Sequence, residues 1–150
     1  MLGDGFLHRY FLNNGGKRLH KWFHYFDIYE RHFERFRNRA PTILEIGVSG
    51  GGSLQMWKAY FGHGARVIGI DIDPICKAHD EVGIEIFTGS QDDPALINQI
   101  IDRYDAFDII IDDGSHIMRH VYDSVVVFEK RPQGTRQTSI TTGMGYAEQE

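Results

Sequence analysis

One segment, running from Ile43 to Ser53, constrains the fold of this chain more than any other. An apolar strand leads into a turn with glycines at 47 and 50–52, and a helical pattern follows. This order of elements opens the nucleotide-binding type of α/β sheet. Glycines in such a turn let a ligand approach the backbone closely, and free N–H groups at the helix start can donate to it.

The rest of the chain alternates between strand and helix patterns. Strands are expected at 42–46, 66–71, 84–87 and 107–112, and helices at 51–61, 94–104 and 117–130, with a short helix or turn at 74–79. The isoleucine run at 109–111 is typical of a parallel strand that is buried on both faces. The alternation therefore predicts right-handed crossovers and a doubly wound, Rossmann-like α/β sheet.

Three parts are expected along the sequence. Residues 1–39 form an N-terminal arm, loose over 1–19, and then a helix from His20 to Arg39. Residues 40–130 form the Rossmann-like domain, and 131–150 form a divergent, disordered tail because apolar periodicity stops there. The N-terminal helix carries an aromatic stripe that is expected to pack in the core: Trp22, Phe26, Tyr29, Phe33 and Phe36.

Composition excludes several classes of function. A net charge of −5 argues against a nucleic-acid-binding protein. Cys76 is the single cysteine, so no intrachain disulfide can form, which fits a reducing compartment. No apolar run reaches the roughly 18–20 residues of a membrane span, and the N-terminus lacks the pattern of a signal peptide. A cytoplasmic protein without membrane contact is expected.

The first turn also distinguishes between ligands. A dinucleotide site prefers glycine at the middle position, where this chain has Ser49. Glu45 precedes the turn, and a carboxylate there would repel a pyrophosphate but suit the sulfonium and ammonium groups of S-adenosylmethionine. An NAD-dependent oxidoreductase and a plain structural turn stay open as alternatives.

Polar residues follow the next two strands as well. Asp71 ends the second strand, where an acid accepts hydrogen bonds from ribose hydroxyls in this type of fold. Gln91 and Asp92 come after the third strand and could contact the adenine edge. Asp92 or Asp93 could equally cap the helix that begins at Pro94.

The fourth strand ends in Asp112 and Asp113, and His116 follows shortly after. Two carboxylates and a histidine at the ligand-binding edge favour a divalent cation beside a general base. His116 would accept a hydroxyl proton, since histidine titrates near neutrality. The alternatives are a helix cap for Asp113 and a local hydrogen bond for His116.

Together these segments resemble the class I S-adenosylmethionine-dependent methyltransferases, over about residues 18–129. Within that class the chain is similar to the bacterial group with macrolide-sugar O-methyltransferases and cephalosporin-hydroxylase-like proteins. The resemblance is carried by residues 21–25, 29–33, 43–53, 67–74 and 112–116. It implies methyl transfer to a sugar or natural-product hydroxyl, with magnesium (Mg²⁺) held partly by Asp113 and His116 as the base.

The resemblance also implies a further strand that ends in two acidic metal ligands. After Arg131 neither is expected, which indicates a truncated or frame-altered chain and, as an alternative function, an inactive remnant. The edge of the 107–112 strand would then be unpaired, so a homo-oligomer could form. The cofactor-binding candidates are Glu45, Gly47, Ser49, Gly51, Ser53, Asp71, Gln91, Asp92 and Asp112.

Overall fold

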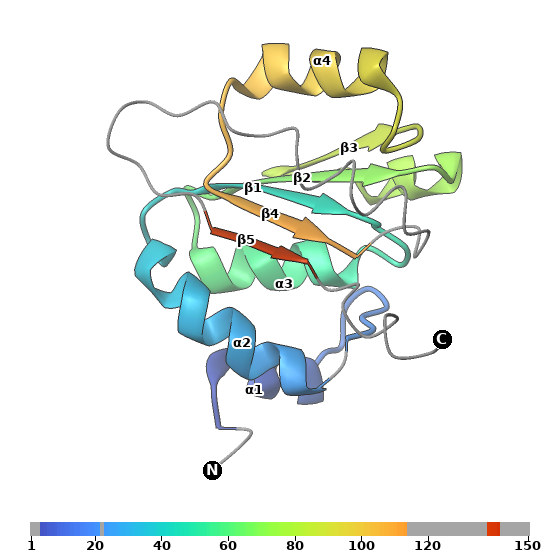
Figure 1. Ribbon diagram of the computed structural model, residues 1–150. Coiled ribbons are helices and arrows are strands. Elements are labelled where there is room, and N and C mark those ends of the chain that lie inside the picture. The colour runs from blue at the N-terminus through green and yellow to red at the C-terminus, as the bar shows by residue number, and fades with distance from the viewer. Residues whose placement is uncertain (1–3, 22, 114–137, 142–150) are drawn as a thin grey trace, which may run out of the picture.

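The computed structural model describes residues 4–21, 23–113 and 138–141. Its centre is a parallel five-stranded sheet in the order β3-β2-β1-β4-β5 (Figure 1). The strands are β1 (Thr42–Ile46), β2 (Arg66–Asp71), β3 (Ile84–Thr88), β4 (Ile109–Asp112) and β5 (Thr138–Thr141). The chain moves outward from β1 to β3 and then returns to the other side of β1. The predicted doubly wound, Rossmann-like sheet is confirmed.

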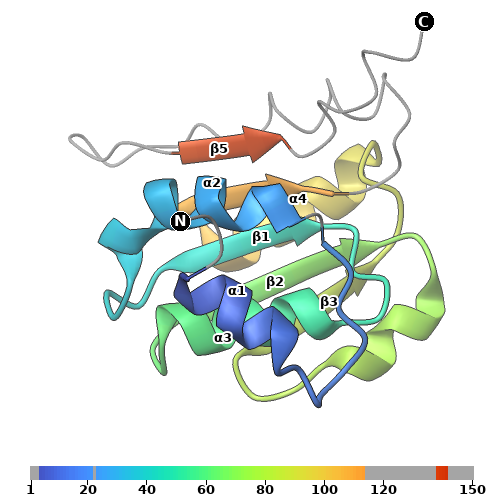
Figure 2. The same ribbon diagram turned by 90° about the horizontal axis from the view of Figure 1, so that it is seen from below.

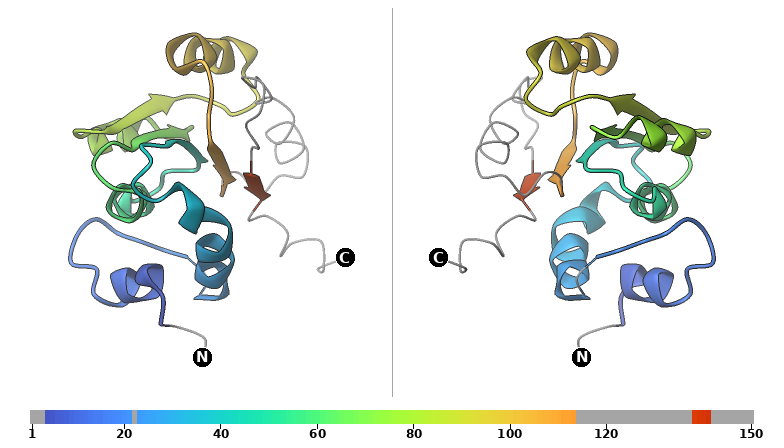
Figure 3. Two further views of the ribbon diagram at one scale, coloured as in Figure 1. Left: turned by 90° about the vertical axis from the view of Figure 1, so that its left-hand side faces the viewer. Right: turned by 90° about the vertical axis from the view of Figure 1, so that its right-hand side faces the viewer.

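Helices cover both faces of the sheet. One face carries α1 (Phe6–Leu12), α2 (Phe23–Phe33) and α3 (Gly52–Phe61), and the other carries α4 (Pro94–Tyr104) (Figures 1 and 2). Two 3₁₀ turns complete the described elements, η1 (Glu34–Phe36) after α2 and η2 (Pro74–His79) after β2. Figure 3 shows the three layers edge-on, with α4 as the described helix on its side of the sheet.

The alternation of side chains along β1 decides which layer each residue meets. Ile43 packs in the cluster under α1, α2 and α3, whereas Leu44 and Ile46 pack under α4. Because successive strand residues point to opposite faces, Glu45 shares the face of Ile43. A carboxylate is thereby directed into the layer that holds most of the aromatic side chains.

The predicted aromatic stripe is confirmed as core at three of its five positions, while Phe36 of η1 is partly buried against the same cluster. Phe26, Tyr29 and Phe33 of α2 are fully buried. The rings of Tyr29 and Phe33 meet the Trp57 ring of α3 with centroids 5.0 and 5.7 Å apart. Aromatic pairs at such distances add to the stability that burial alone gives, so α2 is fixed firmly against α3. Trp22 lies outside the described residues.

The expected loose arm over residues 1–19 is wrong in part. It contains α1, whose Leu7 is fully buried and whose Phe6 ring lies 5.6 Å from that of Tyr60 in α3. Seven residues are too few to show a helical period, and isolated helices of that length are unstable in water. Tertiary packing therefore creates α1. The helix expected from His20 to Arg39 is shorter: α2 begins at Phe23 and ends at Phe33, and η1 continues to Phe36.

The expectation of no strand after Arg131 is also wrong. Strand β5 pairs in parallel with β4, with Ile140 opposite Ile111. The edge of β4 is therefore paired within the chain, which removes the argument for a homo-oligomer through that edge. No Asp or Glu lies in residues 138–141. The helix expected at 117–130 and the remaining tail residues lie outside the described part of the chain.

Candidate functional site

The carboxyl ends of β1 and β4 meet where the strand order reverses. The N–H of Asp113 donates to the carbonyl oxygen of Ile46 at 2.9 Å, which keeps the two ends side by side. Ligands of open α/β sheets bind in the crevice beyond such a reversal. The structure therefore brings Glu45, Gly47, Asp112 and Asp113 to one edge, as the sequence predicts.

Glu45 is fully buried and receives three side-chain hydrogen bonds. Lys21 Nζ and Ser53 Oγ donate to its Oε1 at 2.7 and 3.0 Å, and Trp57 Nε1 donates to its Oε2 at 2.5 Å. Burial raises the pKa of Glu45, and the Lys21 ammonium opposes part of that rise. The protein itself thus supplies a cation for this carboxylate, and a direct contact between Glu45 and a cationic ligand stays a prediction.

Lys21 is the residue that sequence reasoning missed. Its side chain is only 2% exposed, and Nζ also donates to Asp113 Oδ2 at 2.6 Å. Burial acts to lower the pKa of Lys21, but Glu45, Tyr29 and Asp113 together raise it above its ordinary value, so the ammonium is charged. Lys21 belongs to the segments that carry the resemblance, yet nothing in its spacing indicates two acidic partners far along the chain.

Asp71 organises the glycine turn. Its Oδ2 accepts from the N–H groups of Val48 and Ser49 at 2.9 and 3.0 Å, and its Oδ1 accepts from Asp73 N–H at 2.9 Å. Burial would raise the pKa of Asp71, but these backbone N–H donors lower it overall. The turn also needs a left-handed backbone at Ser49, with φ 49°. The predicted Asp71, Gly47 and Ser49 are thus brought together.

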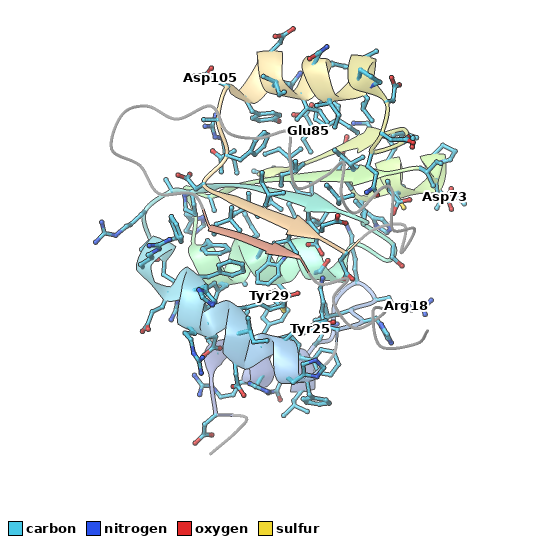
Figure 4. The ribbon with its side chains drawn as sticks, in the orientation of Figure 1. Arg18, Tyr25, Tyr29, Asp73, Glu85 and Asp105 are labelled. Carbon is cyan, nitrogen blue, oxygen red and sulfur yellow. The ribbon has the colours of Figure 1, made fainter. Side chains whose placement is uncertain are left out.

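Part of the glycine turn is occupied by the protein's own chain. The N–H of Gly52 donates to the carbonyl oxygen of Arg18 at 3.0 Å. A Cβ at residue 52 would lie 2.4 Å from that oxygen and 2.5 Å from the Lys17 oxygen, so only glycine fits. Gly51 faces the ring of His79 instead. Figure 4 shows Arg18 and Asp73 at the end of the sheet toward which the strands point.

The third part of the edge follows β3. Asp93 caps α4, since its side chain accepts from Ala95 N–H at 3.0 Å. This leaves Gln91 and Asp92 at the edge, with Gln91 buried and Asp92 accepting a hydrogen bond from Ser90 Oγ. Of the two aspartates proposed as a cap, Asp93 therefore has that role.

The metal and base candidates are described only in part. Asp113 contacts Lys21 as above, while His116 lies outside the described residues. Within residues 4–21, 23–113 and 138–141, no group of three or more His, Cys, Asp or Glu side chains could hold a metal ion. Of the two predicted metal and base residues, the described part of the chain therefore contains Asp113 alone.

Known proteins resemble this chain over about two thirds of its length. No family model matches it. Mycinamicin VI 2''-O-methyltransferase of Micromonospora griseorubida is 46% identical over 104 residues, which is 64% of this chain and 25% of that protein. 8-Demethyl-8-alpha-L-rhamnosyl tetracenomycin-C 2'-O-methyltransferase of Streptomyces olivaceus is 45% identical over 104 residues, which is 65% of this chain and 27% of that protein. The predicted resemblance to methyltransferases is confirmed.

A solved structure agrees with these relatives. MycE methyltransferase in complex with Mg, SAH and mycinamycin VI superimposes with a TM-score of 0.62 at 42% identity, over 67% of this chain and 29% of that one. The chain spans about a quarter of the length of the curated relatives that it matches. Within the described residues, no helix is both long and apolar enough to cross a bilayer.

Proposed function

We propose that this chain is the S-adenosylmethionine-binding part of an O-methyltransferase. The enzyme would transfer the methyl group to a sugar hydroxyl of a natural product. The observation that carries the proposal is the 46% identity, over 104 residues, to a 2''-O-methyltransferase. The geometry of the β1–β4 edge supports it, because Glu45, Gly47 and Asp112 lie at or beside the ends of β1 and β4, where the strand order reverses. The acceptor class comes from relatives that are about four times as long as the match.

The described edge offers a partner for each part of the nucleoside. Three backbone N–H groups donate to the Asp71 carboxylate, and the Cys76 thiol is a further hydrogen-bond partner. A thiol is a weak donor, so a ribose hydroxyl is proposed to take its place on the carboxylate. Ile72 is 72% exposed directly after it and offers an apolar surface to the adenine ring. Gln91 and Asp92 are proposed to contact the polar edge of the base. Ile72 was not among the sequence candidates.

The proposed reaction is an in-line displacement at the sulfonium methyl group. The acceptor oxygen forms a bond to the methyl carbon as the carbon–sulfur bond breaks, which leaves neutral S-adenosylhomocysteine. The hydroxyl proton passes to a general base, proposed to be His116. The contribution of the described residues is to hold the cofactor in one orientation, and such positioning can supply several kcal/mol of the barrier reduction, roughly 7–11 at most.

We also propose, from the resemblance to the methyltransferases, that the enzyme uses a magnesium ion. A divalent cation would stabilise an acceptor alkoxide, and Asp113 would supply one carboxylate ligand. One oxygen of Asp113 is already held by Lys21, and the described residues do not complete a metal site. Location in the cytoplasm likewise stays a prediction.

Ligand binding by the purified chain tests the cofactor. We expect S-adenosylhomocysteine to raise the thermal unfolding temperature and to give a saturable calorimetric isotherm, while NAD does neither. Asp71→Asn is expected to weaken the binding of S-adenosylhomocysteine at least tenfold. Asp102→Asn, a matched change at an exposed position on α4, is expected to leave its affinity within twofold.

Two results would contradict the proposal in different ways. Binding of NAD without binding of S-adenosylhomocysteine would favour the oxidoreductase alternative. Binding of S-adenosylhomocysteine, but no methyl transfer to glycosylated acceptors with or without added magnesium, would favour an inactive remnant.

A further inference from the structure

Residues 14–21, here called the strap, lie across the start of α3 and the glycine turn. The carbonyl oxygen of Arg18 accepts from Gly52 N–H at 3.0 Å, and Lys17 N–H donates to Gln55 Oε1 at 3.2 Å. The strap is also braced internally, because Asn14 Nδ2 donates to the Lys17 carbonyl oxygen at 3.0 Å. One side of the proposed cofactor turn is thus built from a segment about thirty residues earlier in the chain.

Lys21 ends the strap inside the protein. Its Nζ lies 2.7 Å from Glu45 Oε1 and 2.6 Å from Asp113 Oδ2. Glu45 belongs to β1 and Asp113 follows β4, so one ammonium joins the strap to both strands that flank the reversal. By contrast, Lys17 pairs with Glu81 at 3.4 Å between partly exposed side chains. Exposed pairs of that kind contribute little, and the buried contact is the stronger fastening.

We propose that Lys21 is a positioning residue for the cofactor site: its ammonium fastens the strap to the ends of β1 and β4 and so holds the glycine turn in its binding conformation. This rests on the proposed function only for the identity of the ligand. The charge is the essential element, because an apolar side chain could fill the same volume but could not attract two carboxylates. The residue acts through Glu45, Asp113 and the strap and not by touching the reacting methyl group.

Hydrogen exchange tests the fastening independently of any ligand. Lys21→Met keeps the length of the apolar stem and removes the charge. We expect amide exchange in residues 14–21 and 47–53 to accelerate at least tenfold in this variant. Lys17→Met changes the other strap lysine in the same way and is expected to alter exchange less than threefold. Should Lys21→Met not fold, the pair Lys21→Met/Glu45→Gln, which also removes the unpaired buried charge, is measured instead with the same expectation.

Calorimetry with S-adenosylhomocysteine tests the link to the cofactor. We expect at least tenfold weaker binding in Lys21→Met and a change within twofold in Lys17→Met. Unchanged exchange in Lys21→Met overturns the fastening, and faster exchange with unchanged affinity overturns the positioning role. If the unmodified chain binds no S-adenosylhomocysteine, the proposed function and the positioning role both fail, while the exchange data still decide whether Lys21 fastens the strap.

Discussion

Replacing Lys21 with methionine leaves the Glu45 carboxylate buried without its cation. Asp113 tolerates the change better, because 27% of its side chain is exposed and water can replace the ammonium. Glu45 is fully buried, and among the described residues the donors that remain to it are the neutral Ser53 and Trp57. Removing one partner of a buried ion pair costs about 3–5 kcal/mol of stability. Glu45 limits this loss by taking up a proton.

The proton sets both the size and the pH dependence of the effect. Protonating a carboxyl group costs about 1.4 kcal/mol for each pH unit above its ordinary pKa of about 4.3. The loss from Glu45 in Lys21→Met is therefore at most about 1 kcal/mol at pH 5, about 3.7 kcal/mol at pH 7 and about 5 kcal/mol at pH 8. Burial already raises the pKa of Glu45 in the folded chain, and loss of Lys21 raises it further.

The direction follows from proton binding. A folded state with a raised carboxyl pKa binds the proton more tightly than the unfolded state, so this contribution is present at low pH and is lost as pH rises through the folded pKa. Urea unfolding followed by tryptophan fluorescence at pH 5 and pH 8 measures it. Glu45→Gln added to Lys21→Met should remove the pH-dependent part. If Lys21→Met lowers the free energy of unfolding by the same amount at pH 5 and pH 8, the reasoning is refuted.

Three further changes test single contacts. Gly52→Ala should weaken the binding of S-adenosylhomocysteine, measured by calorimetry, at least tenfold. The Cβ of the new alanine would lie 2.4 Å from the Arg18 carbonyl oxygen and displace the strap. Asp93→Ala should lower the free energy of unfolding, measured by urea titration, by about 1 kcal/mol because the α4 cap is lost. Asp92→Ala, at a neighbouring residue that does not cap α4, is the control in the same titration. Asp71 has a lowered folded pKa, so its stabilisation is present above its ordinary pKa and is lost as pH falls. In Asp71→Asn the thermal unfolding temperature, measured at a series of pH values, should accordingly fall less steeply than in the unmodified chain below about pH 4.

The sheet was predictable because its signals are local. The strands at 42–46 and 66–71 and the helix at 94–104 are found at the predicted residues, since each has its own apolar period and a turn signal on either side. Segments without a local signal were missed. Helix α1 exists through its contacts with α2 and α3, and β5 is a short polar strand that only its pairing with β4 identifies.

The candidate site divides in the same way. The order of strands placed Glu45, Asp71 and Asp113 at one edge, and sequence reasoning found all three because acids at strand ends can be read directly. Their partners could not be read. The cation that neutralises Glu45 comes from a residue 24 positions earlier, and the N–H donors of Asp71 come from the turn after β1.

The sequence by itself determined the kind of sheet, the edge where a ligand would bind and the resemblance to methyltransferases, because periodicity and glycine spacing act over a few residues. Tertiary structure alone decided that Glu45 faces a lysine and that the glycine turn is covered by the strap. Side-chain direction along β1 and the docking of α2 on α3 bring together groups that are distant in the chain, and no local pattern records such contacts.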